Sequence, residues 1–362
     1  MVECEAGAGA KSKADSHASA TVLGVCSSGV LVVGSSPLSP AGLAMLSCSA
    51  KGASLSIAPT FGRSITGSGL KVPVEAVHDC QKALAEATWE VLQMQPKDDE
   101  DPSSRFECIM LLPPSRLGED TSKPPLIVVP HGGPHSCLPT SFIASYAYMC
   151  ALQGYALLHV NFRGSTGFGN DFLNSLPGKI GTQDVADVLQ ATEYVCSTGL
   201  VDEKRVGILG GSHGGFLTCH MTSQFPGVYK AAATRNPVCN IPTMVTVTDI
   251  PDWCFVEALG IGSYDFDASR PPSSEAVTKM WEASPIRRVG EVKAPTLMAI
   301  GMKDRRVPPS QGQEWYHSIR DSVPAKMLLY PQDTHAIDKP LSDADHWVNV
   351  AAWMREHLKG AA

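Results

Sequence analysis

The serine at position 212 lies in a pattern typical of a catalytic nucleophile. Residues 209–215 read Leu-Gly-Gly-Ser-His-Gly-Gly, so glycines stand two positions before and after Ser212. This G-x-S-x-G pattern follows a short apolar run, residues 206–209, and precedes a segment of helical composition. An exposed serine on a sharp turn between strand and helix needs this context, and Gly210 and Gly214 leave room for the turn. A glycine-rich turn without chemistry has the same pattern, so the other parts of a site must be identified.

A carboxylate and a histidine follow later predicted strands. Asp304 comes after the apolar run 296–300, and His335 comes after the run 327–330. Both stand at the carboxyl end of a strand, the edge at which active sites of parallel sheets lie. A serine hydroxyl is scarcely ionised at neutral pH, so His335 would take its proton while Asp304 accepts the other imidazole N–H. We therefore predict Ser212 as nucleophile, His335 as base and Asp304 as the acid that orients it.

Other residues after Asp304 offer alternatives for the acid and the base. His317, His346 and His357 each lie within a helical pattern, and we expect them to be surface histidines. Asp333 is close to His335 in sequence but on the same short loop, from which it bridges back to the imidazole only awkwardly. Asp304 and His335 are therefore preferred.

Acyl transfer also requires N–H donors for the negative oxygen of the tetrahedral intermediate. The backbone N–H of His213, directly after the nucleophile, supplies one. The second is expected from the Pro-His-Gly-Gly-Pro-His segment at residues 130–135, which follows the predicted strand 126–129. Loops of this type supply an oxyanion donor in such sites, and we favour the amide of Gly133.

Two further features allow a second interpretation. The H-x-x-x-H spacing of His131 and His135 could bind a metal, but a Gly-Gly-Pro turn lacks the helical face that presents zinc ligands, and we expect no metal. Arg235 directly follows the predicted strand 229–234. It could meet a carbonyl or carboxylate of a substrate or equally form a structural ion pair, and the sequence leaves this open.

Composition excludes several classes of protein. The 362 residues include 29 basic and 36 acidic side chains, a net charge of −7, which argues against nucleic acid or an anionic membrane as partner. The 11 cysteines are spread singly, as free thiols in a reducing compartment would be. No apolar run approaches the roughly 18 residues that span a bilayer, and the N-terminus does not resemble a secretory signal. We expect a soluble cytoplasmic protein.

Residues 105–362 alternate short apolar strands with helical patterns, which predicts an α/β domain with a mainly parallel sheet and flanking helices. The alternation lapses at residues 237–285, which we expect to cross the sheet edge where a substrate pocket would lie. The predicted strands are residues 106–112, 126–129, 155–160, 229–234, 296–300 and 327–330, and the clearest helices are residues 184–194 and 345–358.

The part before residue 105 differs in composition. Eleven of residues 1–20 are Ala, Gly or Ser, and we expect disorder there. Residues 21–104 contain short strands that suggest part of a β-propeller and end in an acidic linker from residue 97. Four adjacent carboxylates in that linker could bind a cation, but a solvated charged run is the preferred interpretation. The predicted strands are residues 22–25, 30–33, 43–46 and 87–92.

Several motifs, in their order, resemble the acylaminoacyl-peptidase branch of the prolyl oligopeptidase family of serine peptidases, over about residues 106–358. The histidine after the nucleophile and the Asp-Ile-Pro-Asp-Trp-Cys segment separate this branch from other members. The motifs are His-Gly-Gly-Pro-His at residues 131–135, Asn-Phe-Arg-Gly-Ser-Thr-Gly-Phe-Gly at 161–169, Gly-Gly-Ser-His-Gly-Gly at 210–215, Ala-Thr-Arg-Asn-Pro at 233–237, Asp-Ile-Pro-Asp-Trp-Cys at 249–254 and Asp-Arg-Arg-Val-Pro at 304–308.

The resemblance implies an α/β-hydrolase fold and cleavage of short N-acylated, typically N-acetylated, peptides to release the N-terminal acylamino acid. It places the family's nucleophile, acid and base on Ser212, Asp304 and His335, and implies homo-oligomerisation, a cytosolic location and no cofactor. Members of the family carry a complete β-propeller before the hydrolase domain. About 105 residues precede it here, and their strands resemble the last portion of that propeller. The two interpretations of this short N-terminal part are a truncated product and an incomplete gene model.

Two other functions compete with this hypothesis. The first is a broader carboxylesterase that uses the same residues on esters. The second is a truncated fragment without catalysis that serves as a binding partner. A peptide with a blocked N-terminus is the preferred substrate, because the sequence offers no paired carboxylates for a free terminal amine.

Overall fold

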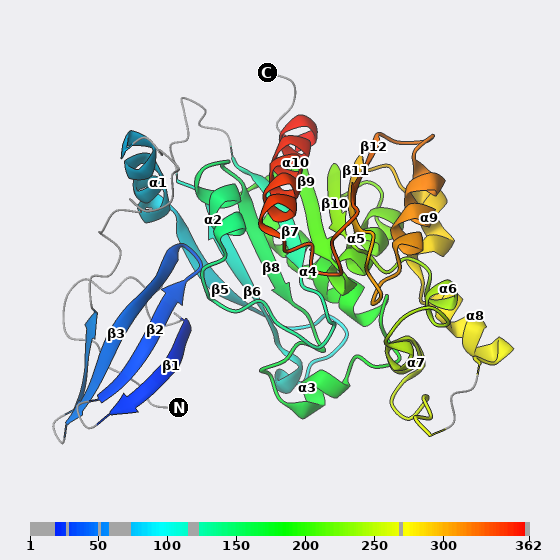
Figure 1. Ribbon diagram of the computed structural model, residues 1–362, viewed down its shortest axis with the longest axis horizontal. Coiled ribbons are helices and arrows are strands. Elements are labelled where there is room, and N and C mark those ends of the chain that lie inside the picture. The colour runs from blue at the N-terminus through cyan, green and yellow to red at the C-terminus, as the bar shows by residue number, and fades with distance from the viewer. Residues whose placement is uncertain are drawn as a thin grey trace. The chain divides into compact units, whose positions relative to one another are not determined.

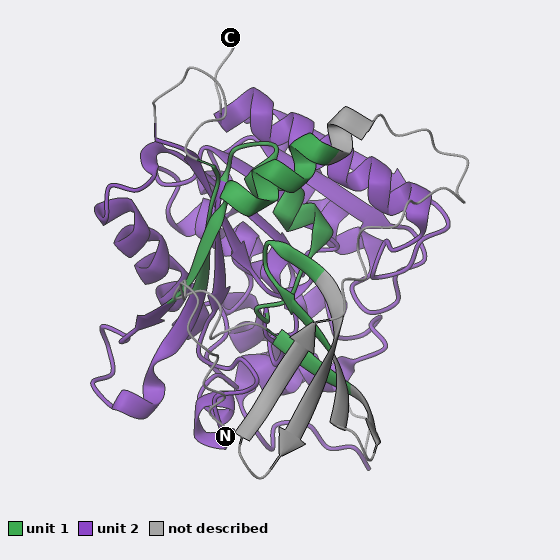
Figure 2. Ribbon diagram, turned by 90° about the vertical axis from the view of Figure 1, so that its left-hand side faces the viewer, with its two compact units in different colours: residues 1–91, 109–121, 139–155 green, residues 92–108, 122–138, 156–362 purple. Residues whose placement is uncertain are grey.

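The computed structural model describes residues 19–26, 29–49, 52–57, 74–114, 123–267 and 271–358. Residues 1–18, most of the segment for which disorder was expected, lie outside this part. The chain divides into two compact units, coloured in Figure 2. One comprises residues 1–91, 109–121 and 139–155, and the other comprises residues 92–108, 122–138 and 156–362.

The first strands form a four-stranded sheet in which consecutive strands pair antiparallel. Valine and leucine runs alternate here with Gly- and Ser-rich turns, as in a propeller blade. The three predicted strands are confirmed, and a fourth was missed. The strands are β1 (Ser19–Cys26), β2 (Gly29–Ser36), β3 (Ser39–Ser49) and β4 (Gly52–Ile57).

The helix α1 (Val74–Glu86) interrupts the segment that was expected to be all-β. Its residues are mostly Ala, Glu, Gln, Lys and Leu, which have high helix propensity. Within its unit it contacts α2 (Ala144–Ala151).

An eight-stranded sheet has the order β12-β11-β10-β9-β7-β8-β6-β5 (Figure 1). The pairs of β7 with β8 and β9, and of β10 with β9 and β11, are parallel, as is β11 with β12. The mainly parallel sheet is therefore confirmed. The strands are β5 (Thr88–Met94), β6 (Phe106–Leu112), β7 (Pro125–Pro130), β8 (Ala156–Asn161), β9 (Asp202–Gly211), β10 (Ala231–Arg235), β11 (Thr296–Gly301) and β12 (Ala325–Tyr330).

The strand β5 corrects one expectation. Residues 87–92 were assigned to the propeller-like segment, but β5 lies at the edge of the eight-stranded sheet. A short apolar run predicts a strand without indicating which sheet it joins, because its pairing partner is chosen by tertiary contacts. The boundary expected near residue 105 stays a prediction.

Helices pack on both faces of this sheet. A side chain at Gly207 would meet Met354 and Leu358 of α10 (Pro340–Leu358), whereas one at Gly210 would meet α5 (His213–Gln224). Residues an odd number apart on a strand point to opposite faces, so α5 and α10 cover opposite faces. Every residue of β7, β8 and β11 is buried, as expected for strands covered on both sides.

The irregular stretch predicted at residues 237–285 contains three helices, α6 (Ile241–Met244), α7 (Pro251–Leu259) and α8 (Ser274–Glu282). The other helices include α3 (Asn170–Asn174), α4 (Gln183–Ser197) and α9 (Pro309–Ile319). The predicted helices at residues 184–194 and 345–358 lie within α4 and α10. In the described part of the chain, no helix is both long and apolar enough to cross a bilayer.

Candidate active site

Ser212 occupies the turn between β9 and α5, with φ 57° and ψ −121°. Positive φ is uncommon for a residue with a side chain and marks a strained turn. Its backbone N–H donates to the carbonyl of Arg235 at 2.9 Å, and its carbonyl accepts the N–H of Phe216 at 2.9 Å. The hydroxyl does not cap the helix, although Ser212 is the N-cap residue. The backbone is therefore fixed while the Oγ atom stays available.

Two glycines make this turn possible. A Cβ atom on Gly210 would overlap the carbonyl of Gly214, and one on Gly214 would overlap the carbonyl of Pro130. Both atoms belong to the backbone and cannot move aside. The glycine pattern in the sequence therefore reflects close approach of β7, β9 and the start of α5.

The structure brings the predicted base and acid into contact. His335 Nδ1 lies 2.6 Å from Asp304 Oδ2. Asp304 Oδ1 accepts the backbone N–H groups of Arg306 at 2.8 Å and Val307 at 3.0 Å. The Asp304 side chain is fully buried, whereas that of His335 is 30% exposed. A buried, hydrogen-bonded carboxylate therefore orients an accessible imidazole and selects the tautomer with its proton on Nδ1.

Ser212 and His335 follow the parallel strands β9 and β12, whose carboxyl ends lie at one edge of the sheet. Within the described part of the chain, no hydrogen bond joins Ser212 Oγ to His335. Catalytic hydrogen bonds often tighten only when a substrate is bound, so this geometry is compatible with the predicted roles.

The predicted oxyanion loop lies beside the nucleophile. A Cβ atom on Gly132 would be 3.4 Å from Ser212 Cβ and 3.1 Å from the carbonyl of Gly211, so a side chain would crowd the serine. The carbonyl of Gly133 accepts a hydrogen bond from the indole N–H of Trp253 at 2.9 Å. Helix α7 thus holds the carbonyl of Gly133, on the same residue as the predicted donor N–H. The amides of Gly133 and His213 remain predicted donors.

An ion pair anchors the same loop a few residues later. His135 Nε2 lies 3.2 Å from Glu257 Oε1, and its Nδ1 lies 2.8 Å from the carbonyl of Gly164. The Glu257 side chain is 5% exposed. The hydrogen bond that His135 donates to the Glu257 carboxylate raises the pKa of His135 above its usual value of 6.5, against the opposing effect of burial. Sequence analysis missed Glu257 and Trp253 as positioning residues, although Trp253 belongs to a motif of the resemblance.

A second buried pair holds the residue after the nucleophile. His213 Nε2 donates to Asp184 Oδ2 at 2.8 Å, and neither side chain is exposed. Asp184 Oδ1 accepts the N–H groups of Gly181 and Val185. The carboxylate therefore ties the start of α4 to the first residue of α5. Asp184 was not found from sequence because it lay inside a helical pattern.

The alternative residues have other partners. Asp333 Oδ2 accepts the hydroxyl of Ser342 at 2.7 Å and not a proton of His335. His346 corrects the expectation of a surface histidine, since it is only 3% exposed on α10. Burial lowers the pKa of His346 to about 4, so the ring is neutral. Arg235 lies beside Gly211 and makes no ion pair within the described ranges.

The histidines considered for a metal also have partners. His131 Nε2 lies 2.7 Å from Ser165 Oγ, and its ring stacks on Phe162 with centroids 4.3 Å apart. Burial lowers the pKa of His131 to about 4. His135 is paired with Glu257. Among the described residues, no group of three His, Cys, Asp or Glu side chains is arranged to hold a metal ion.

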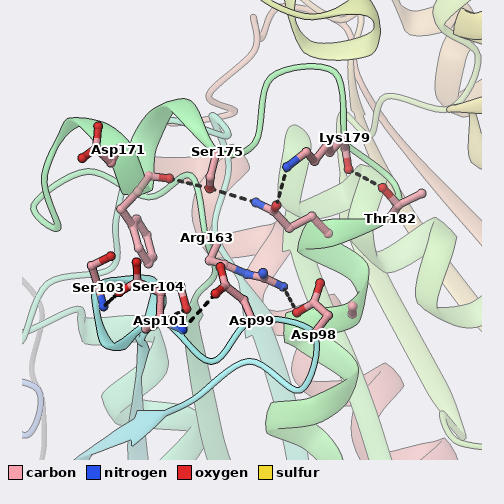
Figure 3. Close-up of a pocket in the computed structure, with 13 residues that line it drawn as sticks. Asp98, Asp99, Asp101, Ser103, Ser104, Arg163, Asp171, Ser175, Lys179 and Thr182 are labelled. Carbon is pink, nitrogen blue, oxygen red and sulfur yellow. Dashed lines mark hydrogen bonds and ion pairs between the residues drawn. The ribbon is translucent and has the colours of Figure 1, made fainter.

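A pocket of about 520 Å³ lies apart from the predicted catalytic residues. It is lined by acidic residues of the predicted linker, such as Asp98, and by residues of α3 and α4 (Figure 3). Its lining includes Asp98, Arg163 and Lys179 but neither Ser212 nor His335. Arg163 pairs with the buried Asp187 at 2.7 Å and with Asp98 at 2.8 Å. The predicted linker is thus partly tied to the domain by an ion pair, while Asp98 itself stays 61% exposed.

The model of the prolyl oligopeptidase family matches residues 140–361. The acylamino-acid-releasing enzyme of Arabidopsis thaliana is 46% identical over 246 residues, which cover 68% of this chain and 32% of that protein. The human acylamino-acid-releasing enzyme is 42% identical over 275 residues, 75% of this chain and 37% of that protein. The chain therefore spans about a third of the length of these relatives.

Solved structures support the fold. The acylaminoacyl peptidase of Pyrococcus horikoshii superposes with a TM-score of 0.72 at 22% identity, covering 94% of this chain and 50% of that one. A puromycin-hydrolyzing peptidase of Mycobacterium tuberculosis superposes with a TM-score of 0.72 at 20% identity, covering 92% of this chain and 46% of that one. At these identities the likeness concerns the fold alone, and it confirms an α/β-hydrolase architecture.

Replacing Asp304 tests which carboxylate orients the base. Asp304→Asn should lower kcat by about four orders of magnitude, as the corresponding change does in other serine hydrolases, because the imidazole then adopts the wrong tautomer. The measurement is kcat for a chromogenic ester with purified protein. Asp333→Asn, on the loop of His335, is the matched control and should retain kcat near that of the wild type. A larger loss in the control would assign the acid to Asp333.

Replacing Glu257 tests the anchor of the oxyanion loop through its pH dependence. The raised pKa of His135 means that the pair stabilises the fold fully below pH 6.5 and that this contribution is lost as pH rises through the raised value. Glu257→Gln should therefore lower the free energy of unfolding by about 1–2 kcal/mol at pH 5, and by less at pH 8. Urea denaturation at both pH values measures this.

The control for that experiment is Glu275→Gln, which removes an exposed carboxylate that pairs with Lys279 on α8. Exposed pairs contribute little, so this variant should match the wild type at both pH values. If Glu257→Gln shows the same deficit at pH 5 and pH 8, the charge of His135 does not contribute to the anchor.

Proposed function

The chain belongs to the prolyl oligopeptidase family, and on that premise we propose that it is a serine peptidase that removes acylamino acids from short N-acylated peptides. The observation that carries the proposal is the 2.6 Å hydrogen bond between His335 and Asp304, at the sheet edge where the strained turn presents Ser212. The names of the relatives supply the substrate class, since the acylamino-acid-releasing enzymes of Arabidopsis thaliana and Homo sapiens share 46% and 42% identity with this chain.

In the first half of the reaction, Ser212 Oγ attacks the carbonyl carbon of the N-acylated residue, and His335 Nε2 takes the hydroxyl proton. The carbonyl π electrons move to oxygen and form the tetrahedral intermediate. His335 then gives the proton to the leaving nitrogen, the C–N bond breaks, and a peptide with a free amine departs. Asp304 stays ionised throughout and stabilises the imidazolium.

In the second half, water takes the place of the departed peptide. His335 removes a proton from the water as its oxygen attacks the acyl-enzyme. The second tetrahedral intermediate collapses, Ser212 regains its proton from His335, and the acylamino acid leaves. The atoms balance as the hydrolysis of one amide bond.

The negative oxygen of both intermediates requires fixed donors. The amides of His213 and Gly133 are proposed for this role, and the positive end of the α5 dipole, at His213, points to the same place. The packing supports a rigid arrangement, because Asp184 holds the ring of His213 and Trp253 holds the carbonyl of Gly133. Fixed dipoles of this kind need no reorganisation during the reaction.

We also propose a cytoplasmic location. Eight of the 11 cysteines are free thiols, at positions 80, 108, 137, 150, 196, 219, 239 and 254, and disulfides are rare in reducing compartments. Among them, Cys219 and Cys239 lie 3.9 Å apart as thiols inside the core.

A fluorophosphonate probe tests the nucleophile and an anilide tests the substrate class. The wild-type chain should react covalently with the probe, and Ser212→Ala should not, because only an activated serine attacks phosphorus. Acetyl-alanyl p-nitroanilide should then be hydrolysed faster than alanyl p-nitroanilide, which carries a free amine. Intact mass and p-nitroaniline release measure the two results.

The competing hypotheses predict other outcomes. A chain that labels and hydrolyses p-nitrophenyl esters but releases anilide only at background level is a carboxylesterase. A folded chain that does not label is the non-catalytic fragment. Thermal unfolding of the wild type and of Ser212→Ala serves as the control for folding.

A further inference from the structure

Backbone conformation singles out one residue that the reaction scheme does not use. Among the described residues, three other than glycine have positive φ, namely Ser212 at 57°, Asn236 at 43° and Ile337 at 48°. One is the predicted nucleophile, and Ile337 lies two positions after the predicted base. Strained conformations gather at functional sites because the surrounding structure must hold them there. We therefore expect the remaining residue, Asn236, to be part of the same site.

The position of Asn236 explains this association. It directly follows β10, which lies between β9 and β11 in the sheet. The strand β9 leads to Ser212, and β11 leads to Asp304. Residue 235 accepts the N–H of Ser212 through its carbonyl, and the N–H of Asn236 donates to the carbonyl of Ala299 at 2.9 Å. Asn236 thus stands between the nucleophile and the acid.

The side-chain amide of Asn236 reaches the third part of the site. Its Oδ1 accepts the N–H of Gly301 at 2.8 Å, and its Nδ2 donates to the carbonyl of His335 at 2.8 Å and, more weakly, to that of Thr334 at 3.5 Å. One side of the amide faces a donor and the other faces acceptors, and this defines its orientation. Asn236 is 2% exposed. Water therefore cannot replace these bonds.

We propose that Asn236 is a positioning residue that sets the place of the His335 imidazole relative to Ser212. Its amide joins the end of β11 to the backbone of His335, while its own backbone is joined to the residue that holds Ser212. The 30% exposed imidazole makes one side-chain hydrogen bond within the described chain, to Asp304. That bond fixes the direction of the ring, whereas the bond from Asn236 fixes its backbone.

The backbone conformation and the side-chain hydrogen bonds together explain why residue 236 is an asparagine. Asparagine tolerates the left-handed region better than other residues with a side chain, and it carries a donor and an acceptor on one short group. Aspartate at this place would turn an oxygen toward the carbonyl of His335, where a donor is needed. Glycine would keep the backbone at φ 43° and remove the side-chain hydrogen bonds.

This inference rests on the proposed serine chemistry, and the test separates the two. The measurement is the rate of fluorophosphonate labelling of the whole chain. Asn236→Asp should label about 100-fold more slowly than the wild type, because a displaced base no longer receives the serine proton. Asn349→Asp is the control, with the same change at an asparagine of α10 whose Nδ2 also donates to a backbone carbonyl, that of Asp345 at 2.8 Å, and should label at the wild-type rate.

A double-mutant cycle shows whether Asn236 acts through His335. In the His335→Ala background, the slow residual labelling should not change further with Asn236→Asp. Equal slowing in both backgrounds would indicate damage to the turn at Ser212 and overturn the proposal, as would wild-type labelling by Asn236→Asp. With acetyl-alanyl p-nitroanilide, the loss should appear in kcat and leave KM unchanged.

Asn236→Gly replaces the aspartate variant if that variant does not fold. Its labelling rate is then compared with the wild type and in the His335→Ala background in the same way. Failure of both variants to fold, while Asn349→Asp folds, would overturn the proposal in favour of a purely structural role. A wild-type chain that labels but releases no anilide would contradict the proposed substrate class alone. A folded wild-type chain that does not label would contradict both.

Discussion

The sharp turn at Ser212 is the constraint on which the arrangement depends. The turn places the carbonyls of Gly214 and Pro130 where side chains of residues 210 and 214 would otherwise project. Backbone atoms cannot move aside, so glycine is required at both positions. The same close approach brings the loop after β7 against the nucleophile, with Gly132 packed on Ser212. The turn therefore exposes the serine and also determines how near an oxyanion donor can lie.

Buried ionic and polar groups then hold the surrounding loops. Asp184 binds His213, Glu257 binds His135, and Asp187 binds Arg163, each with at least one nearly unexposed partner. Removing a charge from water is costly, and only a close partner offsets that cost. Such a pair therefore tolerates few alternative arrangements. Loops at a sheet edge would otherwise move, and these pairs give them defined positions around a half-buried serine.

Much of the fold and part of the site could be predicted from local patterns. Alternating apolar strands and helical stripes predicted a parallel sheet, and the order of strand ends then indicated Asp304 and His335. The prediction was wrong where local pattern carries no information about neighbours. The strand β5 joins a different sheet from the one expected, and His346 faces the core, because a helical pattern does not show which side a neighbouring helix or sheet covers.

By itself the sequence determined the chemical groups and their order: a serine between glycines, then an aspartate and a histidine after successive strands. Those features are local. Because the carboxyl ends of parallel strands lie at one edge of the sheet, residues that follow these strands come close together. Only the tertiary structure decided which groups orient them. Asp184 meets His213 across 29 residues, and Asn236 meets the backbone of His335 across 99. Such partners lie in different elements, and the physical reason they are found only in the fold is that hydrogen bonds depend on distances in space that sequence spacing does not encode.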